Sequence, residues 1–210
     1  YVMEKSVKKF VLYICLSICI CMLYGCKDAE EKKESAKEWN FSEILGNQDF
    51  SVDATEVGTA AKGTVICYER NPNVIELRLI SLISIGSEDW GGVAFYFPTG
   101  CELVDVLCTF PNQIKKFDNV SYFEIWNTES TDGEYNLGVE VGRSHEYIPV
   151  GGGNGIIIID ALYHGDLDKG EELRFAVECG ATYEDGAVIW GIDDDEVVVE
   201  ISHIPEKGEK

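Results

Sequence analysis

The chain has 210 residues, of which 17 are Lys or Arg and 38 are Asp or Glu, so its formal net charge at pH 7 is -21. Hydrophobic residues make up 45% of the chain, a globular composition that can bury a sizeable core and excludes disorder of the whole chain. No nucleic-acid partner is expected, because binding to nucleic acid draws most of its affinity from Lys and Arg side chains that neutralise phosphates.

The N-terminal segment has the succession of a secretory signal peptide. A mostly basic stretch at residues 3–9 precedes an apolar run at residues 10–23, which only Ser17 interrupts. A membrane-spanning helix needs about 20 apolar residues, and polar Lys27 follows this run closely, so a cleaved signal is favoured over a permanent transmembrane helix. Residues 1–25 are therefore predicted to be a signal peptide.

The end of the apolar run, Leu23-Tyr24-Gly25-Cys26, resembles the lipobox of bacterial lipoproteins, in which an aliphatic, a variable and a small residue precede a cysteine. The resemblance implies cleavage before Cys26 and a diacylglycerol on its thiol. Two acyl chains anchor a protein stably where one chain is marginal. We therefore expect a lipoprotein anchored in the bilayer through acylated Cys26, on the outer, extracytoplasmic face of a bacterial membrane.

A tether and one all-β domain are expected after the signal. Residues 26–38 are predicted to form the tether, because residues 27–37 lack large apolar side chains and mix both signs of charge. Within residues 39–210, short runs rich in Val, Ile, Thr, Tyr and Phe recur between Gly, Asn, Asp and Pro clusters. The predicted strands are 51–57, 64–69, 74–85, 92–97, 102–110, 120–126, 135–141, 155–163, 172–178, 187–190 and 196–202.

The pairing of these strands is expected to be antiparallel. Leu173, Phe175 and Val177 alternate with polar or small neighbours, as in a strand with one buried face. Short turns rather than helical crossovers join the strands, so two sheets packed as an immunoglobulin-like or jelly-roll β-sandwich are predicted. Residues 92–106 and 167–177 resemble cohesin-type and other extracellular immunoglobulin-like modules in their strand–turn–strand rhythm, which implies no particular binding residue.

Four cysteines belong to the predicted domain: Cys67, Cys101, Cys108 and Cys179. Export permits disulfides and the even count fits them, but their spacings match no zinc pattern. Their apolar, strand-like neighbours are equally typical of small buried thiols. The sequence leaves both states open.

The acidic run Asp193-Asp194-Asp195-Glu196 offers the oxygen ligands that Ca²⁺ prefers. Adjacent side chains diverge, however, whereas a Ca²⁺ site needs about six to eight converging oxygens. We therefore predict a solvated acidic turn between two strands and no cofactor. A Ca²⁺ site at these residues is the alternative.

No catalytic motif emerges. His145, His164 and His203 are widely separated, and no Ser or Cys stands in a nucleophile elbow. Glycoside hydrolysis by a pair of carboxylates stays open at this point, because that chemistry needs only a suitable separation of the two groups in space. A noncatalytic domain is therefore expected, with an envelope hydrolase as the alternative.

Aromatic residues beside polar loops are the candidate ligand contacts. Trp90 follows Glu88-Asp89, Trp126 precedes a polar run, and Tyr147 adds a third ring. Loops at strand ends commonly hold the ligands of such folds. The sequence thus predicts a binding or interaction module for a glycan, an envelope component or a protein, with Trp90, Trp126 and Tyr147 at its site.

Overall fold

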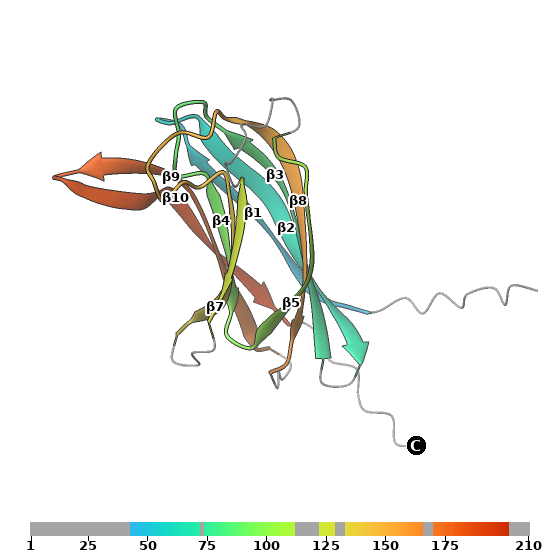
Figure 1. The fold of residues 1–210 in the computed structure, drawn as a ribbon. Coiled ribbons are helices and arrows are strands. Elements are labelled where there is room, and N and C mark those ends of the chain that lie inside the picture. The colour runs from blue at the N-terminus through green and yellow to red at the C-terminus, as the bar shows by residue number, and fades with distance from the viewer. Residues whose placement is uncertain (1–42, 72–73, 112–121, 129–132, 166–169, 202–210) are drawn as a thin grey trace, which may run out of the picture. The chain divides into compact units, whose positions relative to one another are not determined.

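The computed structural model describes residues 43–71, 74–111, 122–128, 133–165 and 170–201. These residues form strands and no helix (Figure 1). In the described part of the chain, accordingly, no helix is long and apolar enough to cross a membrane. The predicted signal peptide, Cys26, the tether and His203 lie outside the described residues. The strands are β1 (Ile44–Ala54), β2 (Thr59–Asn71), β3 (Val74–Ile85), β4 (Val93–Pro98), β5 (Cys101–Cys108), β6 (Phe123–Asn127), β7 (Tyr135–Val141), β8 (Gly153–Tyr163), β9 (Glu172–Glu184) and β10 (Ala187–Glu200).

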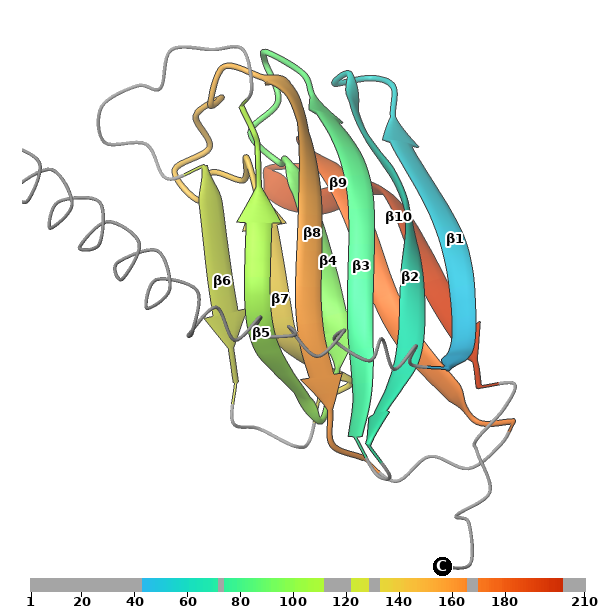
Figure 2. The same cartoon turned by 90° about the vertical axis from the view of Figure 1, so that its right-hand side faces the viewer.

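The strands form two five-stranded sheets. The first sheet has the order β1-β2-β3-β8-β5, and the second has the order β10-β9-β4-β7-β6. Every strand pairing is antiparallel. Figure 2 shows the first sheet in front of the second. The predicted antiparallel two-sheet β-sandwich is confirmed.

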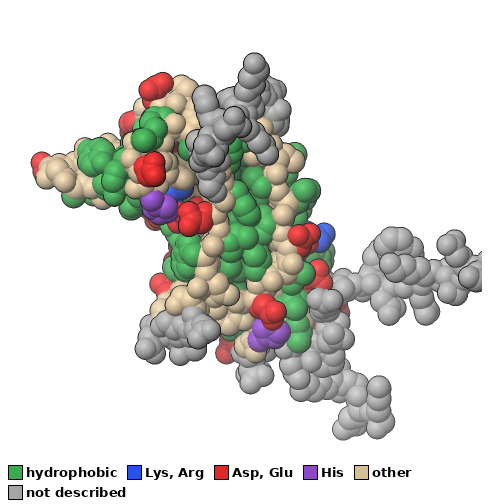
Figure 3. All heavy atoms as spheres, viewed as in Figure 1, with side chains coloured by type: hydrophobic (Ala, Val, Ile, Leu, Met, Phe, Trp, Pro, Cys, Tyr) green, Lys and Arg blue, Asp and Glu red, His purple; other side chains and the backbone are tan. Residues whose placement is uncertain are grey.

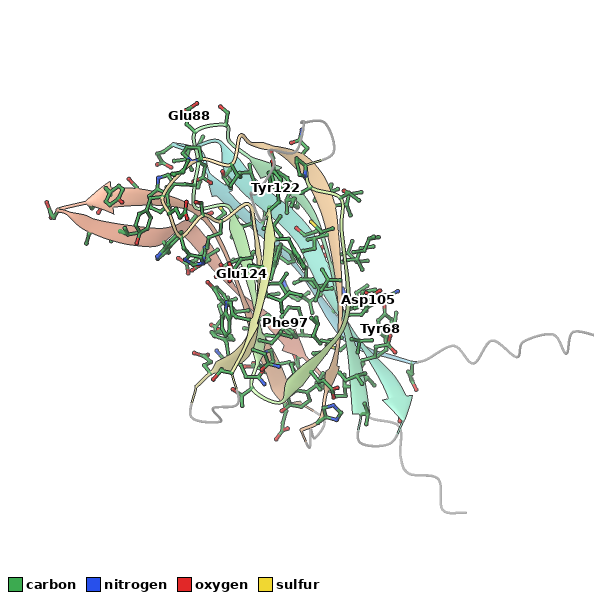
Figure 4. The ribbon with its side chains drawn as sticks, viewed as in Figure 1. Tyr68, Glu88, Phe97, Asp105, Tyr122 and Glu124 are labelled. Carbon is green, nitrogen blue, oxygen red and sulfur yellow. The ribbon has the colours of Figure 1, made fainter. Side chains whose placement is uncertain are left out.

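The core lies between the sheets because the inward positions of the strands are apolar. Leu77 and Leu79 of β3 alternate with outward Glu76 and Arg78, and both leucines are buried. In the second sheet, Phe97 of β4 packs edge to face on Phe175 of β9, with ring centroids 5.6 Å apart. Figure 4 labels Phe97 in the interior of the sandwich.

The prediction of two separate strands at residues 187–190 and 196–202 is wrong, because residues 187–200 form the single strand β10. Gly191 has a φ of 68°, and the register with β9 shifts between Trp190 and Asp193. The pairing between β9 and β10 continues on both sides of this irregularity and includes residues 193–196. The predicted acidic turn is therefore also wrong: its residues lie in a strand.

The β9–β10 hairpin is bent. Gly180 in β9 and Gly191 in β10 have φ values of 74° and 68°, a left-handed conformation that glycine adopts without steric cost. Asp185 and Gly186, with φ of 51° and 83°, form the two-residue turn at the tip, as in type I′ hairpins. Residues 181–190, hereafter the arm, project from the second sheet (Figure 1).

Three cysteines of the core, Cys67, Cys101 and Cys179, are free thiols that are buried. Burial raises the pKa of Cys67 to about 12 and that of Cys179 to about 11. The pKa of Cys101 rises for the same reason. Since the thiolate is the reactive form, these cysteines act as packing residues at neutral pH.

Candidate ligand-binding site

Four aromatic rings meet where the arm leaves the second sheet. They are Trp90 of the β3–β4 loop, Tyr147 of the β7–β8 loop, and Tyr183 and Trp190 of the arm, hereafter the aromatic cluster. The Trp90 ring centroid lies 5.1 Å from that of Trp190, 5.3 Å from that of Tyr147 and 5.5 Å from that of Tyr183. Trp90 is thus the centre of the cluster.

The outer rings of the aromatic cluster remain accessible. Tyr183 is 56% exposed and Tyr147 is 45% exposed, although each packs against Trp90. Tyr147 has a φ of 61°, and its N–H donates to the Ser144 carbonyl at 2.9 Å in a tight turn. The fold therefore presents two tyrosine faces at defined positions on its surface.

The guanidinium of Arg143 packs against the Trp190 ring of the aromatic cluster. Its Cζ lies 4.7 Å from the centroid of the Trp190 ring, and its side chain is only 4% exposed. Nε donates to the Gly91 carbonyl at 2.9 Å, and Nη2 donates to Glu178 Oε1 at 2.7 Å. Nη1 donates to the Tyr96 hydroxyl at 3.0 Å. The Arg143 side chain thus links Trp190 of the arm to β4 and β9 of the second sheet and to the loop before β4.

The ionisation of this buried group of side chains follows from its packing. Burial raises the pKa of Tyr96, and Glu178, to which its hydroxyl donates at 2.6 Å, raises it further. Burial alone lowers the pKa of Arg143, but Tyr96 and Glu178 outweigh that effect and raise it. Arg143 is therefore a permanent cation here, and Tyr96 a neutral donor.

A histidine and two glutamates lie next to the aromatic cluster. The ligand atoms of Glu124, Glu140 and His145, hereafter the His–Glu cluster, all lie within 4.8 Å of one another. His145 Nε2 and Glu140 Oε2 are 3.0 Å apart, and the His145 ring centroid is 5.4 Å from that of Trp190. The surface is hollowed beneath the arm, where a histidine and acidic side chains gather (Figure 3).

The residues predicted from sequence fall in two places. Trp90 and Tyr147 meet in the aromatic cluster. Trp126 instead lies over Gly138 of the neighbouring strand, where a Cβ would come within 2.2 Å of the indole ring. Its ring centroid is 5.8 Å from that of Tyr96, so Trp126 extends the aromatic surface along the sheet without joining the cluster.

The acidic residues 193–196 of β10 make contacts with different partners. Asp193 Oδ2 accepts the Asp53 N–H at 2.7 Å, and Glu196 Oε1 accepts from Arg174 at 2.8 Å. Successive strand side chains point to opposite faces, so Asp194 and Asp195 diverge. The carboxylates of this run do not converge on one point.

No protein-family model matches the chain, and a search of curated proteins finds no match. The functional argument therefore rests on the geometry of the site.

Proposed function

We propose that this protein is an extracytoplasmic lipoprotein whose β-sandwich binds a glycan at the aromatic cluster. The observation that carries the proposal is the meeting of four rings from three separate segments, with Tyr147 and Tyr183 left 45% and 56% exposed. Exposed apolar groups rimmed by polar side chains are typical of binding sites.

The surroundings of the rings favour a sugar. The apolar face of a pyranose packs on aromatic rings, while its hydroxyls need donors and acceptors nearby. Glu124 and His145 are exposed beside the cluster and supply them. The acidic surface disfavours polyanions, so the expected ligand is a neutral or amine-bearing glycan.

The lipid anchor is supported by the N-terminal sequence. Residues 1–25 have the basic and apolar succession of an export signal, and Cys26 closes the lipobox-like motif. On this proposal the acylated protein sits on the outer face of a bacterial membrane and presents its ligand site to the envelope.

Replacement of Cys26 by alanine is expected to move the protein from the membrane fraction to the soluble fraction or to block its processing, because the acyl chains supply the anchor. Fractionation and the intact mass of the mature protein measure this. Cys108→Ala, a cysteine change within the domain, is the control and should stay in the membrane fraction. A Cys26→Ala protein with unchanged fractionation and mass would contradict lipidation.

Replacement of Tyr183 or Tyr147 by alanine is expected to weaken glycan binding by at least about tenfold, since aromatic anchors carry much of the energy of such sites. A glycan array with the full chain in a non-glycosidic detergent identifies the ligand, and calorimetry gives its affinity. Tyr68→Ala is the control, because Tyr68 lies on the other side of the sandwich (Figure 4). Unchanged affinity in Tyr183→Ala and Tyr147→Ala would place the site elsewhere, and retention of a protein instead of any glycan would overturn the ligand class.

An envelope hydrolase is the second candidate, on the observation that carboxylate oxygens of Glu124 and Glu140 approach within 4.8 Å. Retaining glycosidases hold their two carboxyl groups about 5 Å apart. Against this function, the two carboxylate oxygens of Glu140 contact Arg143 and His145. These contacts leave the carboxylate poorly placed to attack a sugar. Release of new reducing ends from a bound glycan, lost in Glu124→Gln, would assign the hydrolase instead.

A further inference from the structure

The His–Glu cluster joins two kinds of metal-ligating side chain from three parts of the fold. Glu124 is on β6, Glu140 is on β7, and His145 is in the loop that follows β7. We propose that these residues bind one divalent transition-metal ion, with Zn²⁺ as the best match. The site lies beside the aromatic rings and shares Glu124 and His145 with the proposed glycan site, but metal binding is argued from the ligand atoms and charges alone.

The geometry needs only small movements of exposed side chains. Ligand atoms at about 2.1 Å from a tetrahedral Zn²⁺ lie about 3.4 Å from one another. His145 Nε2 and Glu140 Oε2, 3.0 Å apart, are already close to that separation. Glu124 pairs with Glu140 across the β6–β7 ladder, so both side chains point to the same face of the sheet. The exposed Glu124 side chain can move the remaining distance within its rotamers.

The balance of charge is a second and independent argument. The Glu140 side chain is only 7% exposed, and a buried carboxylate requires compensation. Arg143 lies 3.4 Å from Glu140 but 2.7 Å from Glu178, so the shorter contact belongs to Glu178. Arg143 is the cation shared by Glu140 and Glu178, and Glu124 adds a third carboxylate within 4.8 Å of Glu140, so three carboxylates and one guanidinium sum to two negative charges. A divalent cation cancels them.

The kind of ligand selects the kind of metal. Ca²⁺ and Mg²⁺ take oxygen ligands, whereas imidazole suits Zn²⁺ and its first-row neighbours. With His145 coordinating through Nε2, the ring carries its proton on Nδ1. Three protein ligands leave a fourth position for water or for a ligand atom.

Titration of the full chain with ZnCl₂, followed by calorimetry and by Trp fluorescence, tests the site. The His145 ring lies 5.4 Å from that of Trp190, so binding should change the emission. Glu124→Gln and His145→Ala should each weaken Zn²⁺ binding by at least about tenfold, because each removes one ligand. Glu124 and His145 are both exposed, so neither change should impair folding, which circular dichroism verifies.

The chain offers a matched control. His164 Nε2 lies 2.9 Å from Glu102 Oε2, a similar pair on the first-sheet side of the molecule. His164→Ala should leave Zn²⁺ affinity unchanged. A Co²⁺ spectrum without a thiolate charge-transfer band should show that the cysteines are not the ligands. Absence of saturable Zn²⁺ binding, equal binding by the Glu124→Gln and His145→Ala variants, or tighter binding of Ca²⁺ than of Zn²⁺ would overturn the proposal.

Discussion

Replacement of Arg143 by methionine is expected to destabilise the domain by about 3–5 kcal/mol, the usual cost of removing one partner from a buried ion pair. Methionine keeps much of the side-chain volume but removes the hydrogen bonds to Gly91, Tyr96 and Glu178. It also leaves the buried Glu140 carboxylate without its cation. Urea unfolding followed by circular dichroism measures the change in the free energy of unfolding.

Arg174→Met is the matched control for this prediction. Arg174 also contacts two carboxylates, at 2.7 Å from Glu172 and 2.8 Å from Glu196, but its side chain is 48% exposed. Exposed ion pairs contribute little to stability because water and salt screen them. The urea midpoint of Arg174→Met should therefore stay close to that of the wild type. Similar shifts in the two variants would contradict the structural role assigned to Arg143.

The sequence predicted the strands best where turn residues stand at both ends and one face alternates. β3 at Val74–Ile85 and β7 at Tyr135–Val141 match the predicted ranges. β3 follows Asn-Pro-Asn, and its buried side chains are apolar except for Ser81. Local chemistry is sufficient in such cases, because the turn and the buried face are both encoded within about a dozen residues.

The sequence failed where glycine lies inside a strand. Gly180 and Gly191 resemble strand ends in a single sequence, yet they bend the β9–β10 hairpin without breaking its pairing. β9 therefore reaches Glu184, beyond the predicted end at residue 178. β1 likewise begins at Ile44, before the predicted residue 51, because pairing with β2 extends it through the polar residues 46–49. Only the neighbouring strand distinguishes a bend from an end.

The site was predictable only in part for the same reason. Trp90 and Tyr147 could be chosen as aromatic residues beside polar loops, but Tyr183 lies in the arm that the sequence did not predict. Arg143 carries no local signal, since Gly91, Tyr96 and Glu178 come from a loop and two other strands. Contacts between distant segments decide which candidates meet.

Replacement of Asp89 by alanine is expected to destabilise the domain by about 3 kcal/mol or more, because it removes one acceptor group from several buried donors. Asp89 is fully buried. Its Oδ2 accepts the Thr59 hydroxyl at 2.5 Å and the Gly92 N–H at 3.0 Å. Its Oδ1 accepts the Gly91 N–H at 2.8 Å and the Ala181 N–H at 3.3 Å. Urea unfolding measures the loss.

Asp193→Ala is the comparison for Asp89, because Asp193 accepts a single backbone N–H, that of Asp53, at 2.7 Å. One hydrogen bond is expected to contribute about 1 kcal/mol, so the smaller shift should belong to Asp193. Asp89 joins Thr59 at the start of β2 to Ala181 at the base of the arm, next to Trp90. Its loss should therefore also change the Trp fluorescence before global unfolding. Equal urea midpoints for Asp89→Ala and Asp193→Ala, or unaltered emission in Asp89→Ala, would show that the packing of Trp90 against the arm holds this region without the carboxylate.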